Sequence, residues 1–156
     1  DAGFEALAGG LRKTYKRGRN AIDEAYRTRT DEAFHDLRKR VKYHRYHLRL
    51  LRDLWPEVLN ARRNECKRLS DYLGDDHDLA VLRAVLREET DRFDADRVRQ
   101  LEELIHERRQ TLQTATWHLG RKVYAENPKP LAQRVECYWQ AWHDEARGRG
   151  PEATNS

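Results

Sequence analysis

Two rows of side chains with helical spacing run through residues 35–52, and they constrain the fold more than any other feature of the chain. Five cations recur at alternating spacings of four and three residues: Arg38, Lys42, Arg45, Arg49 and Arg52. Such spacing places them on one face of a helix, in a row about 21 Å long. A mostly apolar row precedes it by one residue: Leu37, Val41, His44, Leu48 and Leu51. This segment is therefore predicted to be a bundle helix with one buried face and one charged face.

The rest of the chain also has helical periodicity, and no strand-length segment of alternating residues competes with it. We expect helices over 4–27, 31–55, 56–73, 75–90, 95–123 and from 131 onward. Thr30 and Asp94 are the expected N-caps, Pro56 suits a first helical turn, and Gly74 is interpreted as a C-terminal cap. Leu79, Leu82 and Leu86 are expected to face inward.

The predicted helices follow one another with short connections, which predicts an all-α fold. The expected architecture is an antiparallel bundle of long helical hairpins with about six helices. A single domain is expected over residues 1–146, followed by a flexible tail over 147–156. The chain contains no Met and begins with Asp, so we expect it to be part of a longer product. No apolar run reaches the length of a membrane span and no secretion signal is recognisable, which makes the cytoplasm the default location.

The two cysteines, Cys66 and Cys137, lie far apart in the sequence. This spacing offers neither a CxxC metal motif nor a disulfide framework. Each cysteine falls on an apolar helical row, and both are expected to be buried free thiols.

Positive charge is concentrated near the N-terminus. Residues 11–52 contain fourteen Lys or Arg and five Asp or Glu, a local charge of +9, whereas the whole chain carries +4. Lys and Arg stripes are ordinarily solvated faces with acids interleaved, but residues 37–52 contain no acid. Mutual repulsion costs stability unless an anion neutralises these cations, so the pattern indicates an anion-binding face.

The first predicted helix carries a second basic row. Arg12, Arg19, Tyr15 and Lys16 lie on one side of it. The short connection between the first two helices is expected to bring this row alongside the second, so that the two form a track. His44 lies in the apolar row and is expected to be a core histidine with satisfied hydrogen bonds, while the role of His47 stays open.

Three stretches of the sequence are similar to motifs of a known protein family. The clearest is His35-x-x-Arg38-Lys39-x-x-Lys42-x-x-Arg45-Tyr46, and the others are LRKTYKRGR over 11–19 and LSDYLGDDHDL over 69–79. Together they resemble the CHAD family, the conserved histidine α-helical domain. The resemblance implies a binding module for inorganic polyphosphate, often associated with polyphosphate granules and built from two helical halves around a basic groove.

The chain resembles the C-terminal half of such a domain. A second copy in a homodimer, or a missing N-terminal half, is then expected to complete the groove. The expected function is non-enzymatic polyphosphate binding through a basic face of the first two helices, with no cofactor, metal or catalytic residue. The predicted binding residues are Arg12, Tyr15, Lys16, Arg19, His35, Arg38, Lys39, Lys42, Arg45, Arg49, Lys67 and His77.

Two alternatives give the chain a different binding partner. A nucleic-acid-binding module would rely on the basic row together with stacking aromatics, and Tyr43 and Tyr46 interrupt that row. If polyphosphate is the ligand, nucleic acid is only a competing polyanion. A purely structural bundle would instead bind a protein partner through its acidic half.

A third alternative is a metal-dependent phosphohydrolase. His77 and Asp78 form a His-Asp doublet of the kind found in helical enzymes of that class. The metal site would also need His35 and a distant acid, for which Asp91, Asp94 and Asp96 are the candidates. Acids beside Gly74 also suit a helix start, which is the competing interpretation of this doublet.

Overall fold

The computed structural model describes residues 1–151, and this part of the chain is built from α-helices joined by short turns. The helices are α1 (Ala2–Thr28), α2 (Asp31–Leu50), α3 (Pro56–Glu88), α4 (Ala95–Val123) and α5 (Pro128–Ala146). Short 3-10 turns, Arg52–Leu54 and Thr90–Arg92, lie between α2 and α3 and between α3 and α4. No strand occurs within residues 1–151, so the predicted all-α class is confirmed.

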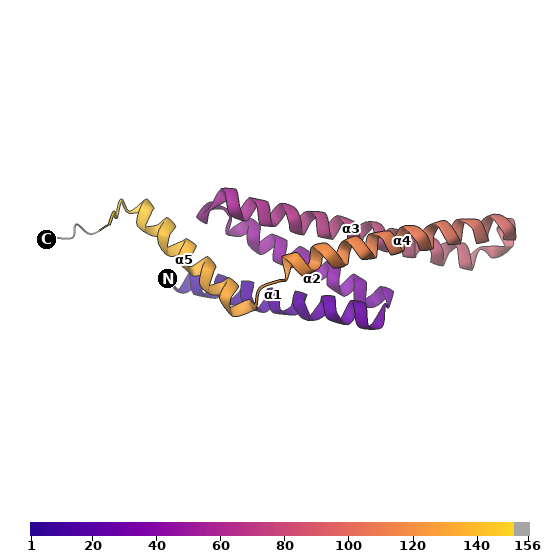
Figure 1. Cartoon of the computed structure of the whole chain (residues 1–156), viewed down its shortest axis with the longest axis horizontal. Coiled ribbons are helices and arrows are strands. Elements are labelled where there is room, and N and C mark those ends of the chain that lie inside the picture. The colour runs from indigo at the N-terminus through magenta and orange to yellow at the C-terminus, as the bar shows by residue number, and fades with distance from the viewer. Residues whose placement is uncertain (152–156) are drawn as a thin grey trace.

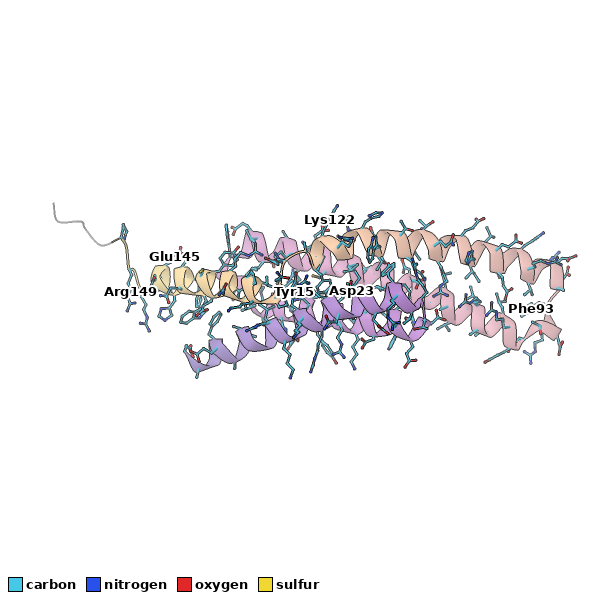
Figure 2. The ribbon with its side chains drawn as sticks, turned by 60° about the horizontal axis from the view of Figure 1, so that its bottom comes forward. Tyr15, Asp23, Phe93, Lys122, Glu145 and Arg149 are labelled. Atoms are coloured by element: carbon cyan, nitrogen blue, oxygen red, sulfur yellow. The ribbon has the colours of Figure 1, made fainter. Side chains whose placement is uncertain are left out.

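Each helix from α1 to α3 packs beside the next helix along the chain and runs in the opposite direction to it (Figure 1). Helices α1, α2 and α3 form the body of the bundle, α4 returns along α3, and α5 lies against α1 (Figure 1). The far ends of α3 and α4 extend beyond α1 and α2 as a two-helix hairpin (Figure 1). Phe93 marks the tip of this hairpin, whereas Lys122 lies where α4 rejoins the body of the bundle (Figure 2).

The predicted helix starts are confirmed by their capping contacts. The Thr30 hydroxyl accepts a hydrogen bond from the amide of Ala33, and the Asp94 carboxylate accepts one from the amide of Asp96. Pro56 occupies the first turn of α3, where a missing N–H costs nothing. These local signals act within one turn of the chain, which is why the sequence alone identifies them.

The predicted break at Gly74 is wrong. Helix α3 continues through Gly74 to Glu88, and the two helices expected over 56–73 and 75–90 are one. A glycine C-cap needs a left-handed backbone, but the positive φ angles within residues 1–151 occur at Arg29 and Gly148. Gly74 is instead a buried helical position whose small size serves a contact with α2.

The core follows the predicted apolar row of α2. Leu37, Val41 and Leu48 have no exposed surface, and Leu51 is almost as deeply buried. They pack with buried side chains of α1, α3 and α5, including Leu11, Leu59, Leu69, Leu131 and Val135. The cationic face of α2 is therefore fixed in place by burial of the apolar face beside it.

A buried ion pair joins α4 to α3. The Arg109 Nε donates to Asp76 Oδ1 at 2.8 Å, and the Arg109 Nη2 donates to Asp31 Oδ1 at 2.7 Å. Gln113 donates to both oxygens of Asp76. Burial acts to raise the pKa of Asp31, but the hydrogen bond and charge of Arg109 outweigh it and lower that pKa. We call Asp31, Asp76, Arg109 and Gln113 the α3–α4 clamp.

Two predicted burials are not found. Leu82 is 40% exposed and lies level with the start of α2, because the neighbouring Arg83 pairs with Asp31, the first residue of α2. Cys137 is exposed on α5, whereas Cys66 is buried as expected. Of the predicted tail over 147–156, residues 152–156 lie outside the described part. None of the helices within residues 1–151 is long and apolar enough to cross a membrane.

Candidate functional site

The cationic face of α2 borders α3. The Arg38 guanidinium lies against Gly74, where an added Cβ would sit 3.2 Å from Nη2. One turn earlier, the rings of His35 and His77 are 5.2 Å apart between centroids. We call Arg38, Lys42, Arg45 and Arg49 the cationic row. Because their spacing keeps them on one helix face, the row follows the surface along which α2 meets α3. We call this strip of surface the groove between α2 and α3.

The cationic row has no acidic partner within residues 1–151. Of the Lys and Arg residues of α2, only Arg40 forms an ion pair in the described structure, with Asp36 at 3.5 Å. The buried Arg38 Nε also lacks a hydrogen-bond partner there. Because an unpaired guanidinium retains its full capacity to bind an anion, the groove offers donors that the protein itself does not use.

Gly74 explains part of the LGDDHD motif. Its missing side chain lets the Arg38 guanidinium approach the α3 backbone. Asp76 points to the other side of α3, into the clamp with Arg109, while His77 returns to the α2 side beside His35. The motif therefore attaches α3 to both of its neighbours instead of ending a helix.

Gly74→Ala is expected to separate stability from ligand binding. Alanine in a helix interior is about 1 kcal/mol more favourable than glycine, so the free energy of unfolding should rise by up to about that amount. The new Cβ would displace the Arg38 guanidinium, because a flexible side-chain end yields before a backbone does. Anion affinity should then fall several-fold. Urea unfolding and calorimetric titration of the same variant measure the two effects, and unchanged affinity would contradict this role of Gly74.

Arg63 of α3 was not among the predicted residues. Arg63 precedes Gly74 by eleven residues, about three helical turns, so both lie on one face. Arg49 follows Arg38 by the same interval on the antiparallel α2, and the contact between Arg38 and Gly74 therefore places Arg49 opposite Arg63. Arg63 also has no ion pair within residues 1–151. The sequence does contain a signal for Arg63, because the interval from Arg63 to Gly74 equals that from Arg38 to Arg49. This equality becomes informative only once α2 and α3 are known to pack against each other.

The basic residues of α1 do not lie beside the cationic row. A Cβ added to Gly10 would be 3.8 Å from His47 Cε1, so this side of α1 faces α2. Arg19 is nine residues further on, about half a turn out of phase, and its Nη1 donates to Asn127 Oδ1 at 2.7 Å. Arg12 and Lys16 share the side of Arg19 and are exposed. The expected track across α1 and α2 is not formed.

Tyr15 is a core residue. It has no exposed surface, and its hydroxyl donates to the carbonyls of Val123 and Glu126 at 3.2 and 2.9 Å. Burial is the main cause that raises the pKa of Tyr15 to about 12, so the phenol stays neutral. The side chain ties α1 to the connection between α4 and α5 and has no atom available to a surface ligand.

The remaining predicted residues, Lys39 and Lys67, are exposed. Lys39 is exposed beside the cationic row on α2. Lys67 is on α3 and forms an exposed ion pair with Asp71 at 2.9 Å. An exposed pair of this kind contributes little stability, so an anion can compete with Asp71 for Lys67 at small cost.

His44 is buried as predicted, but its hydrogen bonds are not satisfied within residues 1–151. Neither ring nitrogen has a partner there, and the ring packs 5.1 Å from that of Tyr15. Burial, helped by the charges of Arg62 and His47, lowers the pKa of His44 to about 3. The imidazole is therefore neutral in the folded protein at any ordinary pH.

This lowered pKa predicts a loss of stability in mild acid. The unfolded chain takes up a proton at His44 near its ordinary pKa of about 6.5, and the folded chain does not, so stability is present above that pH and falls below it. One proton gives a slope of about 1.4 kcal/mol per pH unit, or roughly 2 kcal/mol between pH 6.5 and 5. Urea unfolding across this range measures the slope, and His44→Phe should flatten it. An equal slope in both proteins would contradict the assignment.

The residues of the metal-dependent alternative are not brought together. Within residues 1–151, no group of three or more His, Cys, Asp or Glu is placed to hold a metal ion. His77 adjoins His35, but Asp91, Asp94 and Asp96 lie at or beyond the end of α3. That end is about 16 Å further along the helix from His77. The doublet alone therefore provides no metal site.

Together, the fold and the groove define an all-α bundle protein with a row of uncompensated cations between two antiparallel helices. The profile of the CHAD domain matches residues 2–87, which is more than half of the chain and contains α1, α2 and nearly all of α3. The chain belongs to the CHAD domain family. No curated protein and no solved structure matches it.

Proposed function

We propose that this protein binds inorganic polyphosphate along the groove between α2 and α3, without catalysing a reaction. The observation that carries the proposal is the cationic row, in which four consecutive cations on one helix face have no acidic partner within residues 1–151. Membership of the CHAD domain family supports the same ligand class. The groove between α2 and α3 replaces the face of α1 and α2 expected from the sequence.

The chemistry of the row suits a repeating anion. Polyphosphate is a flexible chain of anionic groups without bases or sugars, so a continuous line of donors is sufficient to bind it. Arg38, Arg45 and Arg49 can grip phosphate oxygens with two N–H groups each, while Lys42 acts as a point charge. Arg63 adds a donor from the α3 side. His35 and His77 lie where the groove continues past Arg38.

Residues outside the groove have a smaller part in the proposal. Arg12, Lys16 and Arg19 extend the positive field without lining the groove, and Tyr15 is not included. A second copy of the chain or an N-terminal half would add a further wall. We place the protein in the cytoplasm, at polyphosphate granules, because the proposed ligand is concentrated there.

Calorimetric titration with long-chain polyphosphate at low salt tests the proposal. We expect saturable binding that weakens as salt is added, because each phosphate contact releases counterions. A phosphate-release assay with and without divalent metal ions should show no turnover. Absence of binding by the intact protein would overturn the proposal, and metal-dependent release that is lost in His77→Ala would favour the phosphohydrolase.

A nucleic-acid ligand is the second candidate, because two aromatic side chains are exposed on α2. Tyr43 and Tyr46 are 47% and 55% exposed, and exposed aromatics beside cations are typical of single-strand binding. Competition separates the two ligands. Polyphosphate should displace a labelled single-stranded oligonucleotide at a far lower concentration than the oligonucleotide needs to displace polyphosphate. The double variant Tyr43→Ala with Tyr46→Ala should leave polyphosphate affinity unchanged. The opposite pattern would favour nucleic acid.

A further inference from the structure

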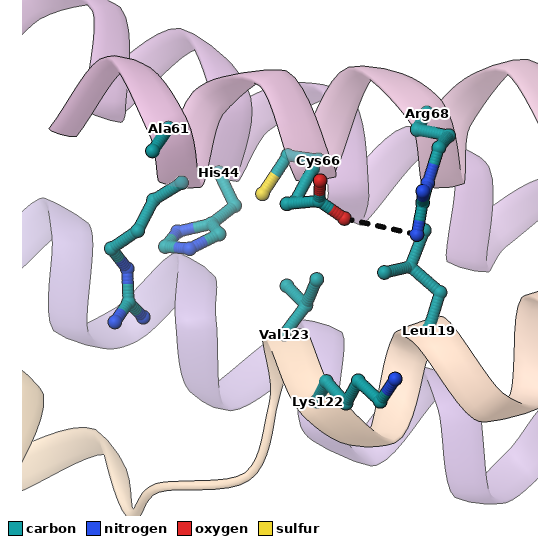
Figure 3. A pocket seen from close by; sticks show the side chains of 9 residues that line it. His44, Ala61, Cys66, Arg68, Leu119, Lys122 and Val123 are labelled. Atoms are coloured by element: carbon teal, nitrogen blue, oxygen red, sulfur yellow. Dashed lines mark ion pairs between the residues drawn. The ribbon is translucent and has the colours of Figure 1, made fainter. Parts of the chain in front are cut away.

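A cleft of about 380 Å³ opens on the other side of α3, between α3 and α4. Its walls are mainly apolar and come from Ala61, Cys66, Leu119 and Val123. Figure 3 shows Cys66 on α3 and Val123 and Leu119 on α4 facing one another across it. The groove with the cationic row lies between α2 and α3, so the two sites have different walls.

His44 of α2 lies at the inner end of the cleft (Figure 3). The residue has no exposed surface, and neither ring nitrogen has a hydrogen-bond partner within residues 1–151. The rings of Tyr15 and Tyr124 pack against it, with centroids 5.1 and 6.0 Å away. A buried polar group without a partner is costly, so the imidazole would gain from pairing with a group that enters the cleft. Because it has no exposed surface, that pairing requires a small shift of the side chains that line the cleft in front of it.

The charges at the rim are largely neutralised by the protein. Arg62 pairs with Glu126 at 2.8 Å, and Arg68 pairs with Glu65 at 3.1 Å. Further in, burial lowers the pKa of His44 to about 3 and raises that of the Cys66 thiol to about 12, so both side chains are neutral. Lys122 also lines the cleft and has no ion pair within residues 1–151, but it is exposed and belongs to the rim. At the inner end, beside His44 and Cys66, a charged group would lose its hydration without gaining a counter-ion. The interior therefore favours a neutral molecule.

We infer that the cleft binds a small neutral molecule of the phenol class, an apolar ring that carries a hydroxyl group. The ring would pack against Leu119 and Val123, and the hydroxyl would pair with His44. A cavity of about 150 Å³ with apolar walls is sufficient for benzene, so the cleft has room for one ring or two. A hydroxyl both donates and accepts, and it therefore suits either tautomer of the imidazole.

Comparison of p-cresol with toluene tests the hydroxyl. The two molecules differ by that group, and one net hydrogen bond gives p-cresol about fivefold higher affinity. Ligand-observed NMR and calorimetry measure both affinities. In His44→Phe, we expect toluene to bind as before and the preference for p-cresol to disappear. The inference is overturned if the intact protein binds neither ligand, if it has no preference for p-cresol, or if His44→Phe keeps that preference.

A second pair of variants tests the place of binding. Val123→Phe adds a ring inside the cleft and should abolish p-cresol binding, whereas the matched Val98→Phe lies on the same helix near the hairpin tip and should leave it intact. Equal binding by these two variants would also overturn the inference. This comparison remains decisive if His44→Phe fails to fold. Polyphosphate affinity should be unchanged in Val123→Phe, which separates this test from that of the proposed function.

Discussion

Replacing Arg38 and Lys42 together by Glu is expected to weaken polyphosphate binding on the order of a hundredfold at low salt. Each substitution removes a charge-assisted contact, worth about 1.5 kcal/mol or more, and adds a repulsive carboxylate. Neither residue has an ion pair within residues 1–151, so the folded protein loses no internal contact of that kind. Calorimetric titration measures the affinity, and circular dichroism checks that the helices remain.

The matched control is Arg97→Glu with Arg108→Glu. These α4 residues are exposed, have no ion pair within the described residues, and lie outside the groove. Both double variants change the net charge by the same amount, so only the groove variant should lose the direct contacts. Equal losses would mean that binding depends on net charge alone and would refute a defined groove.

The salt dependence gives a second measure of the same contacts. In the neutral variant Arg38→Gln with Lys42→Gln, the slope of log affinity against log salt should fall by roughly 1.5 to 2. Two fewer phosphates are neutralised, so fewer counterions are released. An unchanged slope with lower affinity would indicate that the two residues act only by shaping the groove.

The largest expected effect on stability comes from Arg109→Met. This change leaves Asp76, which is 2% exposed, with Gln113 as its remaining partner in the clamp. Removing one member of a buried ion pair costs about 3–5 kcal/mol, because the other charge stays buried without compensation. Urea unfolding followed by circular dichroism measures the change.

Two further variants make this result specific. Arg83→Met removes an ion pair with the half-exposed Asp31 and should cost less than about 1 kcal/mol. Combining Arg109→Met with Asp76→Leu should restore most of the lost stability, since no buried charge then remains. If the double variant is as unstable as Arg109→Met alone, the packing of Arg109 matters more than its charge.

The groove was predictable in part. The spacing of the cationic row and the absence of acids over residues 37–52 are enough to predict an anion-binding face on this helix. The error was the choice of α1 as its neighbour. A helical repeat fixes which residues share a face but not which helix that face meets, and the contact of Gly10 with His47 directs the other side of α2 toward α1.

The LGDDHD segment illustrates why local signals can mislead. Glycine followed by acids is typical of a helix end and a new helix start, and this interpretation divided α3 in two. In the folded chain the Arg38 side chain lies over Gly74, and Arg109 pairs with Asp76. Both partners are far away in the sequence, so an interpretation limited to neighbouring residues had no access to them.

The sequence by itself determined the all-α class, the N-caps at Thr30 and Asp94, the buried face of α2 and the cationic row beside it. These features depend on interactions within a few residues, which helical spacing makes visible. Only the tertiary structure decided that the row borders α3, that Arg63 lies opposite Arg49, that Tyr15 belongs to the core and that His44 lies at the end of a cleft. Each of these depends on how one helix is rotated against another, and that rotation is set by the packing of the whole core.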